Sequence, residues 1–404
     1  MGLNDTPSGE RVHVGFFGLR NAGKSSLVNA VTGQKLSLVS EVKGTTTDPV
    51  KKAMELLPLG PVVIIDTPGI DDTGELGRER VLRAEDMLSE TDVAVLAVDA
   101  SLGLTDPDRD LIKRFEARGI PYVIAYNKSD LPDARMPDDG HGLTVSALTG
   151  AGIGELKERI ARLGRREAEA EKHIAADLLK PGECAVLVIP IDAAAPKGRL
   201  ILPQQQTIRD LLEGGCSVVC CRDTELSCAL EALSAPPSLV ITDSQAFGRV
   251  AKIVPRDVRL TSFSILFARY KGDLAELVKG AAALSKIRDG DPVLISEGCS
   301  HHRQCGDIGT EKLPRWIREF TGAEPAISFT SGGEFPEDLT PWKLVVHCGG
   351  CMLNEREMKS RIARAAETGV PVVNYGVAIA HIHGILRRSL EVFPEALNLL
   401  DGKG

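Results

Sequence analysis

Short apolar runs separated by amphipathic stretches recur along the chain. In the first 165 residues such runs lie at 12–17, 62–65, 93–98 and 122–126, with helical patterns between them. Continuous apolar runs of this length are typical of parallel strands that are buried on both faces. The pattern therefore predicts a doubly wound α/β domain at residues 1–165.

Two further sets of apolar runs follow this domain. They lie at 184–191, 217–221, 238–242 and 262–267, and then at 292–296, 326–330, 343–347 and 371–375, with helical patterns such as 355–368 between them. We predict three α/β domains in total, the last with a parallel sheet. A charged stretch without turn residues marks the first boundary. The expected parts are a helical linker at 166–180, a second domain at 181–270 and a third domain at 271–404.

Composition and charge exclude several classes of function. The chain has 404 residues and a formal net charge of -8, without a basic patch that would bind nucleic acid or an anionic membrane surface. No apolar run approaches the roughly 18 residues that a membrane span needs. The nine cysteines, an odd number in a chain that begins without an apolar leader, argue against a disulfide framework. We expect a cytoplasmic protein with neither nucleic acid nor membrane as a partner.

A glycine-rich loop follows the first predicted strand and precedes a helical stretch at 26–31. Its sequence at 18–25 has the Gly-x-x-x-x-Gly-Lys-Ser spacing of a phosphate-binding loop. In such a loop, backbone N–H groups and the helix N-terminus surround the phosphates, Lys24 reaches the β- and γ-phosphates, and Ser25 ligates magnesium. The residues expected to contact the nucleotide here are Gly18, Asn21, Ala22, Gly23, Lys24, Ser25 and Ser26.

Later strand ends carry the other parts of a nucleotide site. Asp66 ends the second strand and is expected beside the magnesium ion, and Gly69 follows where a γ-phosphate is sensed. The Asp130 carboxylate can accept both N–H donors on the Watson–Crick edge of guanine, an edge that adenine lacks. We therefore expect GTP rather than ATP. Asn127, Lys128, Ser146 and Ala147 complete the predicted base site.

The ordered motifs resemble GTPases of the TrmE-Era type. By this resemblance the threonine run at 44–48 supplies a mobile magnesium ligand, Thr46, and Asn21 helps to hold a potassium ion in place of an arginine finger. Ile70 stands where Ras-like proteins carry the glutamine that orients water. The resemblance implies slow, potassium-stimulated GTP hydrolysis with Lys24, Asn21 and Thr46 as the catalytic residues.

Two groups of metal-ligand residues lie near the C-terminus, each just after a predicted strand. Because the carboxyl ends of parallel strands share one edge of a sheet, we expect the two groups to converge. Three soft thiolates suit an iron-sulfur cluster, and zinc is the alternative. The candidate ligands are the thiols of Cys299, Cys348 and Cys351 and the imidazoles of His301 and His347.

These two groups, appended to a TrmE-like GTPase segment, make the whole chain resemble the HydF family of FeFe-hydrogenase maturation GTPases. The resemblance implies a GTPase domain, a central dimerisation domain and a C-terminal domain that holds a 4Fe-4S cluster. It further implies a scaffold, homodimeric or larger, that delivers a di-iron precursor to apo FeFe-hydrogenase, with the radical-SAM maturases HydE and HydG as partners. The fourth cluster ligand stays open among His347, His301, a carboxylate such as Glu297, and water.

Two other functions stay open from the sequence. The N-terminal segment alone fits a GTPase of tRNA modification or ribosome assembly, although the basic patch is missing. A redox-sensing switch, in which the state of the cluster changes GTP turnover, fits the combination of motifs. In the carrier hypothesis, GTP orders switch segments at 43–48 and 66–75 and so gates contact with the partners.

Overall fold

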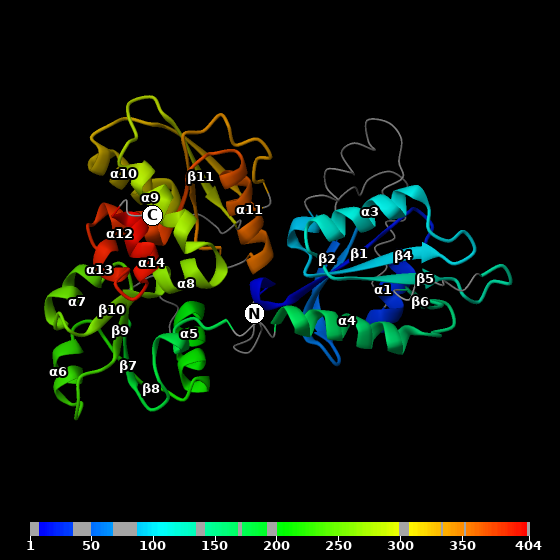
Figure 1. Ribbon diagram of the computed structural model, residues 1–404, viewed down its shortest axis with the longest axis horizontal. Helices are drawn as coiled ribbons and strands as arrows, with labels where there is room; N and C mark the ends of the chain where they lie inside the picture. The colour runs from blue at the N-terminus through cyan, green and yellow to red at the C-terminus, as the bar shows by residue number, and fades with distance from the viewer. Residues whose placement is uncertain are drawn as a thin grey trace. The chain divides into compact units, whose positions relative to one another are not determined.

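Three sheets organise the chain, one for each predicted α/β domain (Figure 1). The computed structural model describes residues 8–34, 50–67, 87–134, 142–168, 172–191, 200–298, 307–332, 334–350 and 353–401. The chain divides into two compact units, Met1–Glu171 with Met352–Glu357, and Lys172–Cys351 with Met358–Gly404. The predicted α/β class is confirmed. Across these described ranges, no helix combines the length and apolar character that a membrane span requires.

Six strands form the sheet of the first unit, in the order β2-β3-β1-β4-β5-β6. Only β2 pairs antiparallel. Phe16 and Val95 pack with α1 and α4, whereas Phe17 and Leu96 pack with α3 on the other face. Both faces are covered, which explains the continuous apolar runs. The elements are η1 Ser8–Glu10, β1 Val12–Gly18, α1 Lys24–Thr32, β2 Val50–Leu56, β3 Gly60–Asp66, β4 Val93–Asp99, α3 Asp106–Ala117, β5 Tyr122–Asn127, β6 Gly142–Thr144 and α4 Ile153–Ala168.

The first sheet of the second unit has four parallel strands in the order β10-β9-β7-β8. The prediction of a strand at 262–267 is wrong, because a helix begins at Phe263. The Ser262 side chain caps this helix by accepting a hydrogen bond from the N–H of Ile265 at 3.4 Å. A short buried apolar run does not by itself distinguish a strand from a helix. The elements are β7 Cys184–Val188, α5 Leu202–Glu213, β8 Ser217–Cys221, α6 Leu226–Glu231, β9 Leu239–Thr242, α7 Phe247–Ile253, β10 Arg259–Ser262 and α8 Phe263–Lys271.

The third sheet is also parallel, in the order β12-β11-β13-β14. Its strands lie where the apolar runs predicted them. Since Ser296 of β11 pairs with His347 of β13, the loops after these two strands leave the same edge of the sheet. The elements are α9 Leu274–Leu284, β11 Pro292–Glu297, η3 Ile308–Lys312, α10 Leu313–Thr321, β12 Ala326–Ser331, β13 Leu344–His347, α11 Glu355–Glu367, β14 Val372–Asn374, α12 Tyr375–Ile382, α13 Leu386–Ser389 and α14 Pro394–Leu400.

The predicted helical linker at 166–180 is not a single helix. The helix α4 continues only to Ala168, residues 169–171 lie outside the described ranges, and the rest contains one short 3-10 turn, η2 Ala176–Leu178. This part of the prediction is wrong for residues 172–180.

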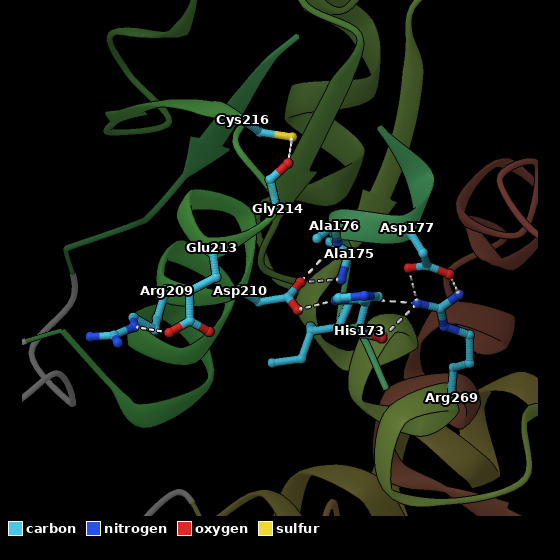
Figure 2. Close-up of polar contacts among 11 residues, drawn as sticks. His173, Ala175, Ala176, Asp177, Arg209, Asp210, Glu213, Gly214, Cys216 and Arg269 are labelled. Carbon is cyan, nitrogen blue, oxygen red and sulfur yellow. Dashed lines mark hydrogen bonds and ion pairs between the residues drawn. The ribbon is translucent and has the colours of Figure 1, made fainter. Parts of the chain in front are cut away.

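Side chains of α5 and α8 explain why no α-helix forms at 172–180 (Figure 2). The Asp210 Oδ2 atom of α5 accepts hydrogen bonds from the N–H groups of Ala175 and Ala176, both at 2.8 Å. Arg269 of α8 donates to the carbonyl oxygens of His173 and Ile174, both at 2.9 Å. The backbone groups that a helix would pair internally are thus bound by tertiary partners.

Candidate functional site

The phosphate-binding loop joins the end of β1 to the start of α1. Gly18 has a φ of +136°, and a Cβ atom there would lie 2.3 Å from the carbonyl oxygen of Ala97 on β4. Gly23 has a φ of +84°, and a Cβ atom there would lie 2.2 Å from Nδ2 of Asn127 at the end of β5. Only glycine fits at these two positions. The loop can therefore lie close against the ends of both strands.

Lys24 occupies the first position of α1. The residue is 8% exposed, and its ammonium group donates to the carbonyl oxygens of Gly18 at 3.0 Å and Leu19 at 2.7 Å. The N–H groups in the first turn of a helix have no partner within the helix, and they add positive potential to that of the ammonium group. This arrangement suits a polyphosphate. Asn21 is exposed in the same loop with a φ of 64°, and Ser26 is exposed on the first turn of α1.

Ser25 and Asp66 lie where the magnesium site is predicted. Ser25 Oγ donates a hydrogen bond to Asp66 Oδ2 at 2.8 Å. The other carboxylate oxygen, Oδ1, is buried and has no hydrogen-bond partner within the described residues. Burial raises the pKa of Asp66, and the Ser25 hydrogen bond and the Lys24 charge offset this only in part. A buried carboxylate oxygen with free lone pairs beside a hydroxyl fits magnesium, which prefers oxygen ligands.

Asn127, the last residue of β5, joins the phosphate loop to the predicted base loop. The residue is 2% exposed. Nδ2 donates to the carbonyl oxygen of Ala22 at 3.0 Å, and Oδ1 accepts from the N–H of Ala147 at 3.0 Å. One buried amide therefore sets the spacing of the two loops that would hold the two ends of a nucleotide.

The base loops contain the predicted carboxylate, and one of them contacts a residue of β4 that the sequence analysis missed. Ser146 Oγ donates to Asp130 Oδ1 at 2.5 Å, which orients the carboxylate. Lys128, with a φ of 64°, donates to Asp99 Oδ2 at 2.6 Å. Burial acts to raise the pKa of Asp99, but hydrogen bonds from Lys128 and Ser101 outweigh it and lower that pKa. Asp99 ends β4 directly after an apolar run, and this position in the sequence could have identified it as a candidate site residue.

Two of the predicted nucleotide-site residues, Thr46 and Gly69, lie outside the described residues. The structure brings together the remaining predicted members of the site, on the loops that follow β1, β3, β5 and β6 at the carboxyl edge of the sheet. This edge is where open parallel sheets bind ligands.

Cys348 begins the loop after β13. Its Sγ atom accepts hydrogen bonds from the backbone N–H groups of Gly298 at 3.1 Å and Gly350 at 3.4 Å. Gly298 directly precedes Cys299 in the loop after β11, so these two loops do approach each other. Cys299, His301 and Cys351 lie outside the described residues. Within the described ranges, no three His, Cys, Asp or Glu side chains form a metal-binding group. A thiolate cradled by N–H groups fits a cluster ligand.

His347 is the last residue of β13 and is 1% exposed. Its Nδ1 atom lies 2.8 Å from the carbonyl oxygen of Cys348, and its Nε2 atom lies 3.1 Å from the guanidinium group of Arg361 on α11. Burial lowers the pKa of His347 to about 4, with a further lowering by the Arg361 charge, against the opposing hydrogen bond to Cys348. The imidazole is therefore neutral at physiological pH.

Glu297 and Tyr375 form a second polar group at this edge. The Tyr375 hydroxyl, at the start of α12, donates to Glu297 Oε1 at 3.2 Å. Burial raises the pKa of Tyr375, and the charges of Glu297 and Cys348 raise it further. A Cβ atom on Gly309 would lie 2.3 Å from the Glu297 carboxylate and 2.4 Å from the Tyr375 hydroxyl, so the pair depends on glycine there. Sequence reasoning named Glu297 but had no signal for Tyr375 or Arg361.

A phosphate loop after β1, a metal-site aspartate after β3 and paired base loops after β5 and β6 define a P-loop GTPase. Residues 13–128 match the model of the 50S ribosome-binding GTPase family. Residues 174–272 match the hydrogen maturase F dimerization domain, and residues 275–392 match the hydrogen maturase F tetramerization domain. The chain belongs to the hydrogen maturase F (HydF) family.

Curated relatives that are GTPases match less than half of the chain. GTPase Der of Kosmotoga olearia is 37% identical over 170 residues, which are 37% of this chain and 38% of Der. The tRNA modification GTPase MnmE of Paraburkholderia xenovorans is 35% identical over 170 residues, 40% of this chain and 36% of MnmE. The chain thus spans less than two fifths of the length of these relatives. A crystal structure of Aquifex aeolicus Era bound to GDP.AlF4- is 20% identical, covers 60% of this chain and 97% of Era, and has a TM-score of 0.33.

Proposed function

We propose that this protein is a GTP-hydrolysing scaffold of FeFe-hydrogenase maturation, which holds a 4Fe-4S cluster and a di-iron precursor and delivers the precursor to apo-hydrogenase. One observation carries the proposal. A chain of the HydF family has GTPase loops on one sheet and, at the carboxyl edge of another sheet, a cysteine thiol that accepts two backbone hydrogen bonds. The dimerization and tetramerization domains support a homo-oligomer.

In the proposed GTP complex, the phosphate loop and Lys24 neutralise the phosphates. Ser25, Asp66 and Thr46 hold magnesium, and Gly69 senses the γ-phosphate. Because the Ser25 hydroxyl already faces the Asp66 carboxylate at 2.8 Å, the two oxygens are preorganised for one ion. The bound magnesium would neutralise part of the phosphate charge. Asp130, held by Ser146, selects guanine by accepting hydrogen bonds from the two N–H donors of the base.

The proposed hydrolysis is slow and stimulated by potassium. Ile70 replaces the water-orienting glutamine of Ras-like proteins, and Asn21 is exposed in the phosphate loop, where its side chain is free to contribute to an ion site beside the phosphates. GTP turnover should be faster in potassium than in sodium, and Asn21→Ala should remove this difference. Equal rates of the unmodified protein in the two salts would contradict the role of Asn21.

In the proposed cluster site, Cys299, Cys348 and Cys351 ligate three irons of a 4Fe-4S cluster. The N–H groups of Gly298 and Gly350 stabilise the negative charge of the Cys348 thiolate. The cluster would supply one iron without a thiolate ligand, at which a precursor can be exchanged; His347, His301, Glu297 and water are the candidates for that position. HydE, HydG and apo FeFe-hydrogenase are the proposed partners, in the cytoplasm.

Paired variants test whether the two sites act as proposed. Cys348→Ala should abolish activation of apo-hydrogenase and leave GTP hydrolysis nearly intact, because the thiol lies on a different sheet from the phosphate loop. Lys24→Ala should abolish hydrolysis and leave the iron and sulfide content of the reconstituted protein unchanged. Zinc binding at the three cysteines without a 4Fe-4S EPR signal would refute the carrier function.

A further inference from the structure

We propose that Arg361 is a positioning residue of the cluster site. It holds the buried imidazole of His347 in place next to Cys348 and prevents this imidazole from binding iron. The inference rests on the proposed function, because it concerns the same cluster. It removes His347 from the four candidates for the fourth ligand that the sequence left open.

Hydrogen-bond chemistry assigns the tautomer of His347. A guanidinium group only donates hydrogen bonds, so the nitrogen that faces Arg361 at 3.1 Å, Nε2, must present its lone pair. In a neutral imidazole the proton then sits on Nδ1, which donates to the carbonyl oxygen of Cys348 at 2.8 Å. Both ring nitrogens are thereby engaged inside the protein, and neither offers a lone pair to iron.

The surroundings of Arg361 show that this contact is built into the fold. Arg361 is 4% exposed, and its second terminal nitrogen donates to the carbonyl oxygen of Gly332 at 3.1 Å. Its guanidinium carbon lies 5.0 Å from the centre of the Phe335 ring, in cation–π geometry. The same ring meets His347 edge-on, with centroids 5.9 Å apart. A rotation of the imidazole would break its contacts with Cys348, Arg361 and the Phe335 ring at once.

His347 is one of several hydrogen-bond partners of Cys348. The N–H of Cys348 donates to the carbonyl oxygen of Ser296 at 2.9 Å, and its carbonyl oxygen accepts from His347. The Sγ atom of Cys348 accepts from the N–H groups of Gly298 and Gly350. The polar atoms of Cys348 are therefore all engaged in hydrogen bonds, which restrict the movement of the thiol. Loss of Arg361 would release the imidazole and loosen this residue. Metal-site partners of this kind typically contribute about 10-fold to 100-fold in metal affinity.

Electron–nuclear spectroscopy on the full chain tests the inference. The protein is produced with 15N-labelled or unlabelled histidine, reconstituted anaerobically with iron and sulfide, reduced, and measured by EPR and HYSCORE. His347→Asn keeps a donor near the Nδ1 position but provides no imidazole. We expect its EPR signal and nitrogen couplings to match those of the unmodified protein. A coupling typical of bound imidazole that disappears in His347→Asn would overturn the proposal.

Chelator competition tests the role of Arg361 itself. In Arg361→Met, the chelator concentration that removes half of the iron should fall by about tenfold. Arg364→Met is the matched control, because Arg364 lies on the same helix and its guanidinium carbon lies 5.7 Å from the Phe335 ring centre. It donates to the carbonyl oxygens of Phe335 and Pro336 rather than to His347. The control should behave as the unmodified protein.

Equal chelator sensitivity of the two arginine variants would refute the positioning role. If Arg361→Met does not fold, as judged by circular dichroism, then Arg361→Lys takes its place. Lysine keeps the charge and can donate to His347 or to Gly332, so it should retain only part of the chelator resistance. A resistance equal to that of Arg364→Met would count against the role. An unmodified protein without any cluster signal would instead refute the proposed cluster site, which separates the two failures.

Discussion

Replacing Asn127 by alanine should weaken GTP binding without touching any group that contacts the nucleotide's phosphates directly. The buried amide makes two hydrogen bonds of 3.0 Å, one to each loop. Each contributes about 1 kcal/mol net, so their loss costs about 2 kcal/mol, more if the buried Ala22 carbonyl finds no water. Because both loops must be ordered in the complex, most of this cost falls on binding. About 2 kcal/mol corresponds to a roughly 30-fold increase in Kd.

The assay is a titration of the full chain with a fluorescent GTP analogue in excess magnesium. Asn374→Ala provides a control, because this asparagine is also buried and caps α12 in the other unit by accepting from the N–H of Val377 at 2.8 Å. Its GTP affinity should equal that of the unmodified protein. If Asn127→Ala binds GTP within about threefold of the unmodified protein, a difference below 1 kcal/mol, the two loops do not depend on this amide and the reasoning fails.

Three further predictions concern pH, the cluster edge and the linker. Folding raises the pKa of Asp66 above its ordinary value of 3.8, so the protein loses stability as the pH rises above 3.8 and this buried carboxyl group ionises. In the absence of nucleotide and metal, Asp66→Asn should therefore raise the Tm of the GTPase unit at pH 7. The gain in Tm should be smaller below about pH 4. Tyr375→Phe removes the donor to Glu297 and should lower the free energy of unfolding in urea by about 1 kcal/mol, and an unchanged urea midpoint would argue against this contact. Asp210→Ala leaves two buried N–H groups without their acceptor and should lower the free energy of unfolding by about 2–4 kcal/mol. Asp210→Asn keeps one oxygen and should lower it by about half as much. Equal hydrogen-exchange rates at Ala175 and Ala176 in both variants would contradict the role of Asp210 as their acceptor.

Most of the parallel strands and the loops that follow them could be predicted from the sequence because both signals are local. A continuous apolar run identifies a strand that is buried on both faces, and a polar residue directly after it lies at the functional edge of a parallel sheet. Asp66, Asn127 and Cys348 were identified as candidate site residues in this way, and Asp99 could have been. The contact between Asn127 and Ala22 was not predictable, because it joins positions far apart in the sequence.

The wrong predictions arose where tertiary partners decide between local alternatives. The apolar run at 262–267 is compatible with a strand or a buried helix, and the Ser262 cap selects the helix. The stretch at 172–180 has helix-forming residues, but Asp210 and Arg269 bind its backbone groups instead. Neither partner is near in sequence, so no local pattern reveals them.

Asn127 and His347 show the same limit at the two sites. Each is the last residue of a strand, each is almost fully buried, and each uses one donor and one acceptor in hydrogen bonds within the protein. In a sequence, a polar residue at such a position can equally be one that binds nucleotide or metal or one that only holds the site in place. The deciding fact is whether its lone pairs are already used. For His347 this depends on Arg361, a residue of a separate helix, so only the fold separates the residues that bind from those that hold them in place.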